Sequence, residues 1–141
     1  MKIKDSKYAQ CLYFTSAALA RKVEKLATQI WKTLDLPPSH AYLLMAVLED
    51  PGMHPSALSA ELHLQPSTIT RLIEKLEEKK LVVRTTEGKI TNVYPTPKAK
   101  ELQPKMKECI QQFSQQYANL LGAEESSRFV KDIARIADKL D

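Results

Sequence analysis

The segment from Pro55 to Arg84 constrains the fold of this chain more than any other part of its 141 residues. It reads PSALSAELHLQPSTITRLIEKLEEKKLVVR, with a proline before each of two apolar-periodic stretches and a β-rich run at its end. Proline is well tolerated at the first position of a helix, because its missing N–H would have no partner there. The pattern therefore predicts two short helices, beginning at Pro55 and Pro66, joined by a tight turn and followed by a strand.

The second predicted helix has two chemically different faces. Its apolar side chains follow the i, i+3, i+4, i+7 spacing of one buried face and are Ile69, Leu72, Ile73 and Leu76. Its polar face is expected to carry Ser67, Arg71, Glu74, Lys75 and Glu78, with Thr68 and Thr70 at the flanks. This division is typical of the recognition helix of a helix-turn-helix, although an ordinary amphipathic surface helix shows the same periodicity.

The polar face contains the side chains that reading DNA requires. Short hydroxyl side chains near the start of a helix can approach phosphates and base edges, and arginine is long enough to reach guanine O6 and N7 in the major groove. We therefore expect DNA contacts from Ser67, Thr68, Thr70, Arg71 and Lys75. The alternative is a charged face that is merely solvated.

Three segments of the chain resemble the MarR family of winged-helix regulators. They are LPPSHAYLLMAVLED at 36–50, STITRLIEKLEEKKLVVR at 67–84 and VYPTPKAKEL at 93–102, in the order and roughly at the spacing of that family. The resemblance covers nearly the whole chain and implies a mainly α fold in a single domain, residues 1–141. Within it, a winged helix-turn-helix at 36–96 would lie between dimerisation helices at 5–34 and 97–141.

The two ends of the chain are expected to form long helices. Asp5 or Ser6 can cap the first, which the Pro37-Pro38 pair would end, and Ser39 can cap the next. Towards the other end, Thr96-Pro97 is expected to start a long helix that Gly122 stops, and a last helix follows.

The apolar stripes of these terminal helices are more than one small domain can easily cover. We therefore expect a homodimer, with a monomeric bundle as the alternative. In MarR-like proteins the first and last helices interlock across a two-fold axis. This sets two recognition helices about one DNA turn apart over a pseudo-palindromic site in double-stranded DNA.

Two β-rich runs, Leu81–Thr85 and Ile90–Tyr94, are separated by a turn near Gly88 and predict a hairpin, the candidate wing. Wings of the MarR family usually carry an Asp-Arg pair near the tip, whereas this segment offers only Lys89 there. A lysine pairs with phosphate as a point charge, so we assign Lys89 a phosphate or shallow-groove contact. Arg84 at the base of the wing is expected to contact the DNA backbone or to pair with a nearby acid.

The charge of the chain agrees with a polyanionic partner. The formal net charge is +4 and the pI is about 9.0, and residues 66–100 hold eight Lys or Arg against four acids. No segment approaches the roughly 18 apolar residues that a membrane span requires. We therefore expect a cytoplasmic protein with no membrane partner.

Two features bear on the signal that the protein would sense. Cys11 lies early in the first predicted helix and is similar in position to the sensing cysteine of the organic-hydroperoxide branch of the family, where a thiolate is oxidised. The tyrosines that assist it in that branch are absent from the aligned positions, and Cys11 is alternatively a packed, inert side chain. The resemblance also implies a small lipophilic or phenolic effector, bound between the dimerisation helices and the winged domain.

The sequence lacks the residues of an enzyme. Its three histidines show no His-x-x-x-His spacing, there is no Cys-x-x-Cys, and its three glycines form no phosphate loop. We therefore expect no catalytic residue, no metal ligand and no cofactor. The function predicted is a homodimeric transcriptional repressor released by a small molecule. The alternatives are a repressor that senses peroxide through Cys11 and a winged-helix module that binds proteins without binding DNA.

Overall fold

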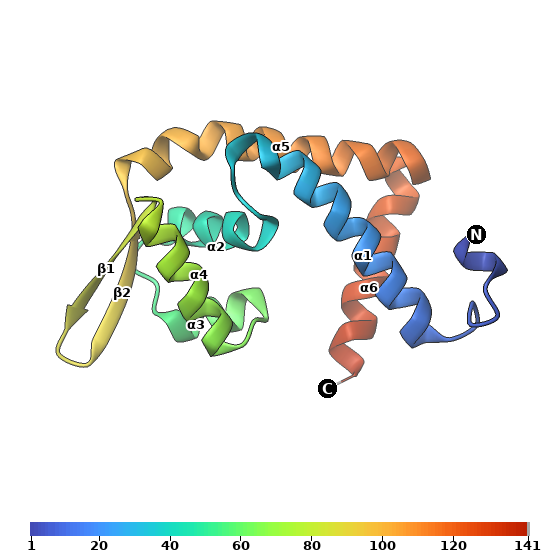
Figure 1. Ribbon diagram of the computed structural model, residues 1–141, viewed down its shortest axis with the longest axis horizontal. Coiled ribbons are helices and arrows are strands. Elements are labelled where there is room, and N and C mark those ends of the chain that lie inside the picture. The colour runs from blue at the N-terminus through green and yellow to red at the C-terminus, as the bar shows by residue number, and fades with distance from the viewer. Residues whose placement is uncertain (141) are drawn as a thin grey trace.

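The computed structural model describes residues 1–140 and shows a mainly helical chain with one antiparallel hairpin (Figure 1). The elements are η1 (Ile3–Asp5), α1 (Leu12–Trp31), η2 (Lys32–Leu34), α2 (Pro38–Glu49), α3 (Pro55–Leu62), α4 (Pro66–Glu78), β1 (Val82–Glu87), β2 (Ile90–Pro95), α5 (Pro97–Leu121) and α6 (Ala123–Lys139). Asp141, the last residue of the predicted range 97–141, lies outside the described residues. The predicted fold class, a mainly α winged helix-turn-helix with long flanking helices, is confirmed.

The helix-turn-helix forms around the four apolar residues predicted for the buried face of α4. Ile69, Leu72, Ile73 and Leu76 are all buried, at 6% exposure or less. They belong to one core cluster that also takes side chains from α1, α2, α3, both strands and α5. Complete burial of each such side chain stabilises the fold by about 1.5–3 kcal/mol. Burial of these four side chains therefore determines which side of α4 faces outward.

Several predicted helix boundaries are confirmed. Pro55 and Pro66 are the first residues of α3 and α4, and Thr96 caps α5 by accepting a hydrogen bond from the Ala99 N–H. Gly122 ends α5 with a φ of 85°, a conformation that favours glycine.

The prediction for the first helix was wrong at both ends. The Ser6 hydroxyl accepts a hydrogen bond from the Tyr8 N–H, which forms a local turn in place of a helix cap, and α1 begins only at Leu12. At the other end the helix tightens into η2, and Asp35 then takes a left-handed conformation with φ 54°. The chain has thus left the helix before Pro37.

The start of α2 also differs from the prediction. Pro38 is the first residue of α2 and Pro37 occupies the cap position, so Ser39 is already inside the helix and does not cap it. Proline at the first position needs no partner for an N–H, which explains why this helix can begin without a side-chain cap.

The wing is slightly longer than predicted. Its strands reach Glu87 and Ile90, leaving a two-residue turn of Gly88 and Lys89 in which Gly88 has φ 64°. Glycine at the first turn position matches the twist of a tight hairpin. At the base of the wing, Val93 exchanges backbone hydrogen bonds with Gly52 (2.8 Å) and Met53 (3.0 Å), which ties β2 to the segment after α2.

The long helix α5 spans the molecule (Figure 1). The helix-turn-helix and wing lie at one end of α5, and α6 and the N-terminal part of α1 lie at the other end. Both groups extend to the same side of α5 in this view, so the chain has the outline of an arch. In the part of the chain that the structure describes, no helix is both long and apolar enough to cross a membrane.

Candidate nucleic-acid interface

The predicted contact residues of α4 lie together on its outer face. Ser67, Thr70, Arg71 and Lys75 are exposed, and Thr68 is half-buried. The Thr70 hydroxyl donates to the Pro66 carbonyl at 3.1 Å. Its proton is therefore already used, and toward a nucleic acid Thr70 can act as a hydrogen-bond acceptor.

Arg71 and Lys75 differ in their ionic surroundings. The ammonium of Lys75 lies 3.6 Å from the Glu78 carboxylate, and both side chains are more than half exposed. Such a surface pair contributes little and is easily exchanged for another partner. Within residues 1–140 no ion pair engages Arg71, so its guanidinium is free at the centre of this face.

The two basic residues of the wing lie in different places. Lys89 is exposed at the tip, where a lysine can reach the backbone of a duplex. Arg84 lies at the base, and its guanidinium approaches the Glu77 carboxylate to 2.7 Å. This pair connects the wing to α4, which favours pairing with an acid over a DNA contact for Arg84.

A hydrogen-bond cluster at the end of α4 positions the wing. Lys80 adopts a left-handed conformation with φ 61°, and the next N–H, that of Leu81, donates back to the Leu76 carbonyl at 2.9 Å. The Thr96 hydroxyl donates to the Lys80 carbonyl at 2.7 Å, while the Lys98 ammonium donates to the Lys79 carbonyl at 3.0 Å. The role of Lys80 was not predicted because no glycine marks this helix end, and that of Lys98 because its contact depends on the tertiary fold.

His40 lies on α2 between the core and α4. Its Nδ1 atom is shielded from solvent and has no hydrogen-bond partner. Burial lowers the pKa of His40 below its ordinary value, and the positive charges of Lys79 and Lys75 lower it further. The imidazole is therefore held neutral beside the recognition helix.

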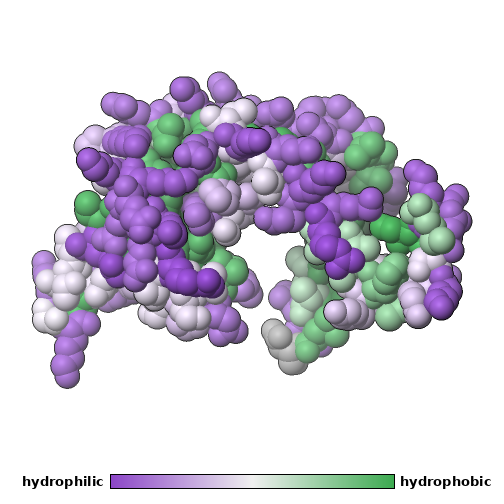
Figure 2. All heavy atoms as spheres, viewed as in Figure 1, coloured by the Kyte–Doolittle hydropathy of each residue, from purple (hydrophilic) through white to green (hydrophobic). Residues whose placement is uncertain are grey.

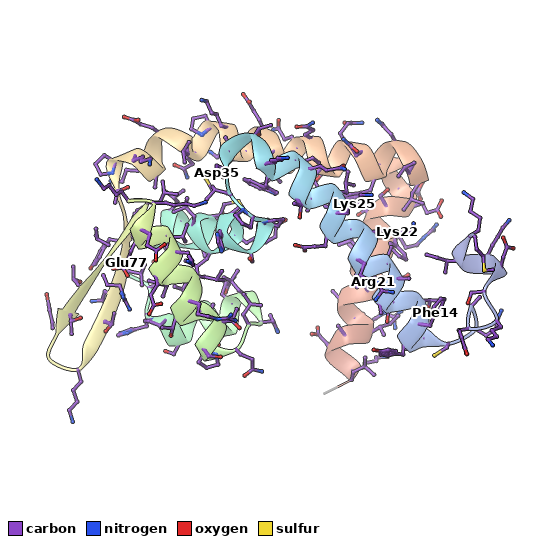
Figure 3. All side chains as sticks on the ribbon, viewed as in Figure 1. Phe14, Arg21, Lys22, Lys25, Asp35 and Glu77 are labelled. Atoms are coloured by element: carbon purple, nitrogen blue, oxygen red, sulfur yellow. The ribbon has the colours of Figure 1, made fainter. Side chains whose placement is uncertain are left out.

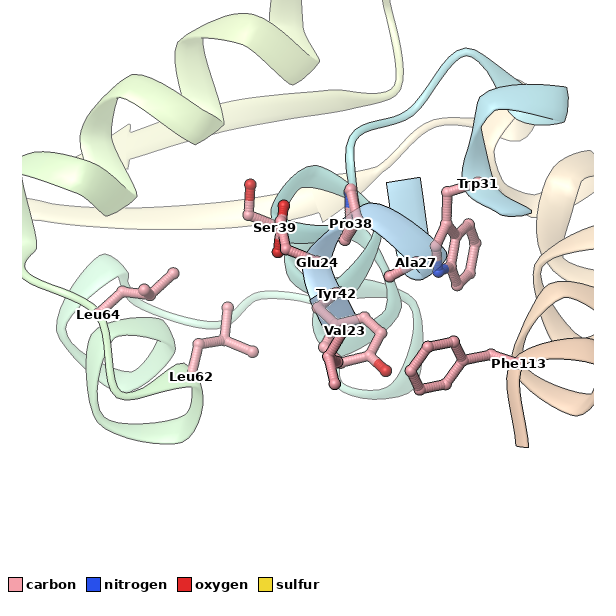
Figure 4. Close-up of a pocket in the computed structure, with 10 residues that line it drawn as sticks. All are labelled: Val23, Glu24, Ala27, Trp31, Pro38, Ser39, Tyr42, Leu62, Leu64 and Phe113. Carbon is pink, nitrogen blue, oxygen red and sulfur yellow. The ribbon is translucent and has the colours of Figure 1, made fainter. Parts of the chain in front are cut away.

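A cavity of about 310 Å³ opens between the helix-turn-helix and the long helices (Figure 4). Most of its lining is apolar or aromatic, and the residues are Val23, Glu24, Ala27, Trp31, Pro38, Ser39, Tyr42, Leu62, Leu64 and Phe113. Burial, together with Tyr117, raises the pKa of Tyr42, so its hydroxyl stays protonated and can donate a hydrogen bond. A site in this place was expected only from the family resemblance, and none of its lining residues was predicted.

The structure corrects both descriptions of Cys11. The residue is not inside a helix but at the N-cap of α1, with an extended backbone, and it is exposed rather than packed. Its N–H donates to the Tyr8 carbonyl at 2.9 Å. Cys109 is the buried cysteine, with its sulfur 3.9 Å from the Thr33 hydroxyl. Residues 1–140 contain no group of three or more potential metal ligands.

The fold and the outer face of α4 define a winged helix-turn-helix protein. The family model that describes the MarR family matches residues 34–89, from η2, just after α1, to the tip of the wing. It is 32% identical over 89 residues to the HTH-type transcriptional regulator SarZ of Staphylococcus aureus, an alignment that covers 63% of this chain. The chain thus spans 60% of the length of that relative.

Solved structures share the fold over almost the whole chain. The repressor CouR bound to a 23-mer DNA duplex superposes with a TM-score of 0.86 at 17% identity, covering 97% of this chain and 99% of that one. The MepR–DNA complex of S. aureus gives 0.82 at 16% identity, covering 92% and 98%. CouR bound to p-coumaroyl-CoA gives 0.85 at 18% identity, covering 96% and 98%.

Proposed function

We propose that the protein is a sequence-specific DNA-binding transcriptional regulator that acts as a homodimeric repressor. The observation that carries the proposal is the outer face of α4, where Ser67 and Arg71 are exposed, Arg71 has no ion pair within residues 1–140, and the apolar side of the same helix is buried. Arginine in this position can bind guanine through two hydrogen bonds. The DNA complexes of the similar proteins MepR and CouR support the same use of the fold.

The homodimer is supported by an apolar face along α6 and its C-cap that residues 1–140 leave largely exposed. Phe129, Ile133, Ile136 and Leu140 repeat at helical spacing, and each is more than 40% exposed. Figure 2 shows apolar residues gathered on this part of the molecule. A second copy that buries this face would place a second recognition helix beside the first, as a pseudo-palindromic site in double-stranded DNA requires.

The cavity supports release by a small molecule. Its size suits one small organic molecule, and its walls combine aromatic side chains with the hydroxyls of Ser39 and Tyr42. A lipophilic or phenolic effector bound there would touch α1, α2 and α5 together. It would therefore favour one separation of the two recognition helices over another.

Titration against DNA tests the function directly. The purified chain would be titrated with the DNA upstream of its own gene, and with a library of random duplexes, at two salt concentrations. A repressor of this kind binds some duplexes specifically, with an affinity that falls steeply as salt rises. Failure to bind any duplex would favour the alternative of a protein-interaction module.

Redox sensing is the second candidate, because Cys11 is exposed and so accessible to an oxidant. The same titration with an organic hydroperoxide separates the two mechanisms. Release of DNA by peroxide from the unmodified chain, but not from Cys11→Ser, would identify a peroxide-sensing repressor. If peroxide does not change the affinity for DNA, the small-molecule effector would remain as the signal.

A further inference from the structure

The outward face of α1 carries a row of positive charges that the helix-turn-helix does not use. Arg21, Lys22 and Lys25 lie in α1 and Lys32 follows directly after it, and all four are exposed. Between residues 12 and 34 the sequence contains one acid, Glu24. We call Arg21, Lys22, Lys25 and Lys32 the basic row.

Helix geometry places the basic row on one side. At 3.6 residues per turn, Arg21, Lys25 and Lys32 project within about 40° of one another, and Lys22 lies next to them. Ile30 projects to the opposite side of the helix and is buried in the core. The row extends for roughly 16 Å at 1.5 Å per residue, which is long enough to follow several phosphates of a duplex.

The charges of the basic row are unpaired within the described residues, whereas three cations in or near α4 have carboxylate partners. The described part of the chain gives no ion-pair partner to any member of the basic row. By contrast, Lys75 pairs with Glu78, Lys79 with Asp35 and Arg84 with Glu77. The basic row is thus a stronger source of unneutralised positive charge than α4 itself.

The basic row faces the same side of the molecule as the outer face of α4. In Figure 1, α1 lies in front of α5 and α4 lies in front of α2, so the outward faces of both helices turn toward the viewer. Figure 3 shows Arg21, Lys22 and Lys25 on this side of α1. The wing extends from the opposite side of α4, away from α1.

The chemistry of the row fits a polyanion better than a second copy of the chain. Like charges brought together across a two-fold axis repel, whereas the exposed face of α6 is apolar and suits that contact. A row of free cations beside a recognition helix attracts the backbone of the DNA that the helix reads.

We propose that the basic row binds phosphates of the DNA between the two half-sites, as a contact additional to those of α4 and the wing. This inference rests on the proposed function. Because the wing lies on the far side of α4, it would hold the outer flanks of the site while the basic row holds its centre. The row would contribute affinity and set the spacing between half-sites without reading bases.

The test compares two double variants of the full chain on a duplex selected from a random library by the unmodified protein. Arg21→Gln with Lys25→Gln removes two charges from the basic row. Lys105→Gln with Lys107→Gln removes two exposed charges from α5 and serves as the matched control. Affinity is measured across a salt series, and hydroxyl-radical footprints are recorded for each protein.

We expect the double variant of the row to flatten the salt dependence by up to about 3.6 in the slope of log K against log salt. Each phosphate contact contributes about 0.9, and a dimer would lose up to four. Its footprint should lose protection at the centre of the site and keep that of the two half-sites, and the control should match the unmodified chain. An unchanged slope and footprint would overturn the inference while leaving the proposed function intact. If the unmodified chain binds no duplex, both are overturned.

Discussion

At the scale of single residues, two of the four cations of the predicted interface already have acidic partners in the described residues. Lys75 and Arg84 both have carboxylate partners within the chain, at 3.6 and 2.7 Å. Arg71 and Lys89 have no such partner in the described residues. The sequence located these residues on an exposed helix face and on a hairpin, but pairing with acids depends on the tertiary fold and was left open for Arg84.

Replacing Arg71 tests direct reading of bases. We expect Arg71→Ala to cost about 1–3 kcal/mol of specific binding, because two hydrogen bonds to guanine would be lost. Arg71→Lys keeps the charge but not the two-pronged geometry, so it should retain the salt dependence and lose sequence preference. Competition binding with specific and random duplexes measures both quantities. Unaltered preference in both variants would show that Arg71 reads no base.

Lys89 should behave differently from Arg71. Because a lysine at the wing tip contacts phosphate and not bases, Lys89→Ala should weaken specific and random duplexes by the same factor. It should also reduce the salt slope by about 0.9 for each subunit that makes the contact. A selective loss for one duplex sequence would instead indicate that the wing reads the groove.

His40 makes stability depend on pH. Burial and the charges of Lys79 and Lys75 lower its pKa in the folded protein, so the folded state disfavours the proton that the unfolded chain accepts near pH 6.5. The free energy of unfolding should therefore fall as the pH drops below about 6.5 and stop falling below the lowered pKa. Urea denaturation at a series of pH values measures this. His40→Gln should lack that part of the slope, and an identical slope in the variant would contradict the assignment.

At the scale of elements, the sequence predicted those with strong local signals. Proline at the first helical position marked α3, α4 and α5, and the apolar spacing of α4 identified its buried face. The start of α1 was missed because Ser6 forms a turn with Tyr8 that competes with helix capping. The conformation of the chain just after α4 was not predicted, because a lysine, Lys80, takes the left-handed position that glycine usually occupies.

Thr96 connects three elements, and its removal should be measurable. Its hydroxyl oxygen accepts from the Ala99 N–H at 3.3 Å and so caps α5, while its O–H donates to the Lys80 carbonyl at 2.7 Å, at the junction of α4 and the wing. We expect Thr96→Ala to lower the free energy of unfolding by about 1 kcal/mol, as the loss of a helix cap usually does. Chemical denaturation gives the value, and Thr96→Ser should restore most of it. Equal stability of the alanine and serine variants would exclude a capping role.

At the scale of the whole molecule, one copy of the chain leaves many large apolar side chains exposed to solvent. The core cluster is concentrated in the helix-turn-helix and the adjoining parts of α1 and α5. The far ends of α1 and α5 and all of α6 keep large apolar side chains exposed, among them Leu12, Leu120 and Ile133. The sequence predicted this imbalance from the apolar stripes, but the cavity needed the structure, because its walls come from four separate segments.

Placing a charge on the apolar face of α6 tests whether dimerisation and DNA binding are coupled. Ile133 lies in the middle of that face and is 46% exposed in one copy, so Ile133→Glu should do little to the fold of a monomer. In a dimer the new carboxylate would be buried opposite its symmetry mate, which is strongly unfavourable. We expect sedimentation to show a monomer. Affinity for a full pseudo-palindromic site should then fall to that for a single half-site, because the two recognition helices are no longer linked.

Ala134→Glu adds the same charge on a different side of α6, at another exposed position, and should leave both the dimer and its affinity unchanged. A dimer of Ile133→Glu with full affinity would show that α6 does not form the interface. A monomer that still binds the full site as tightly as the unmodified chain would show that α6 joins two copies but that the joining is not needed for DNA recognition.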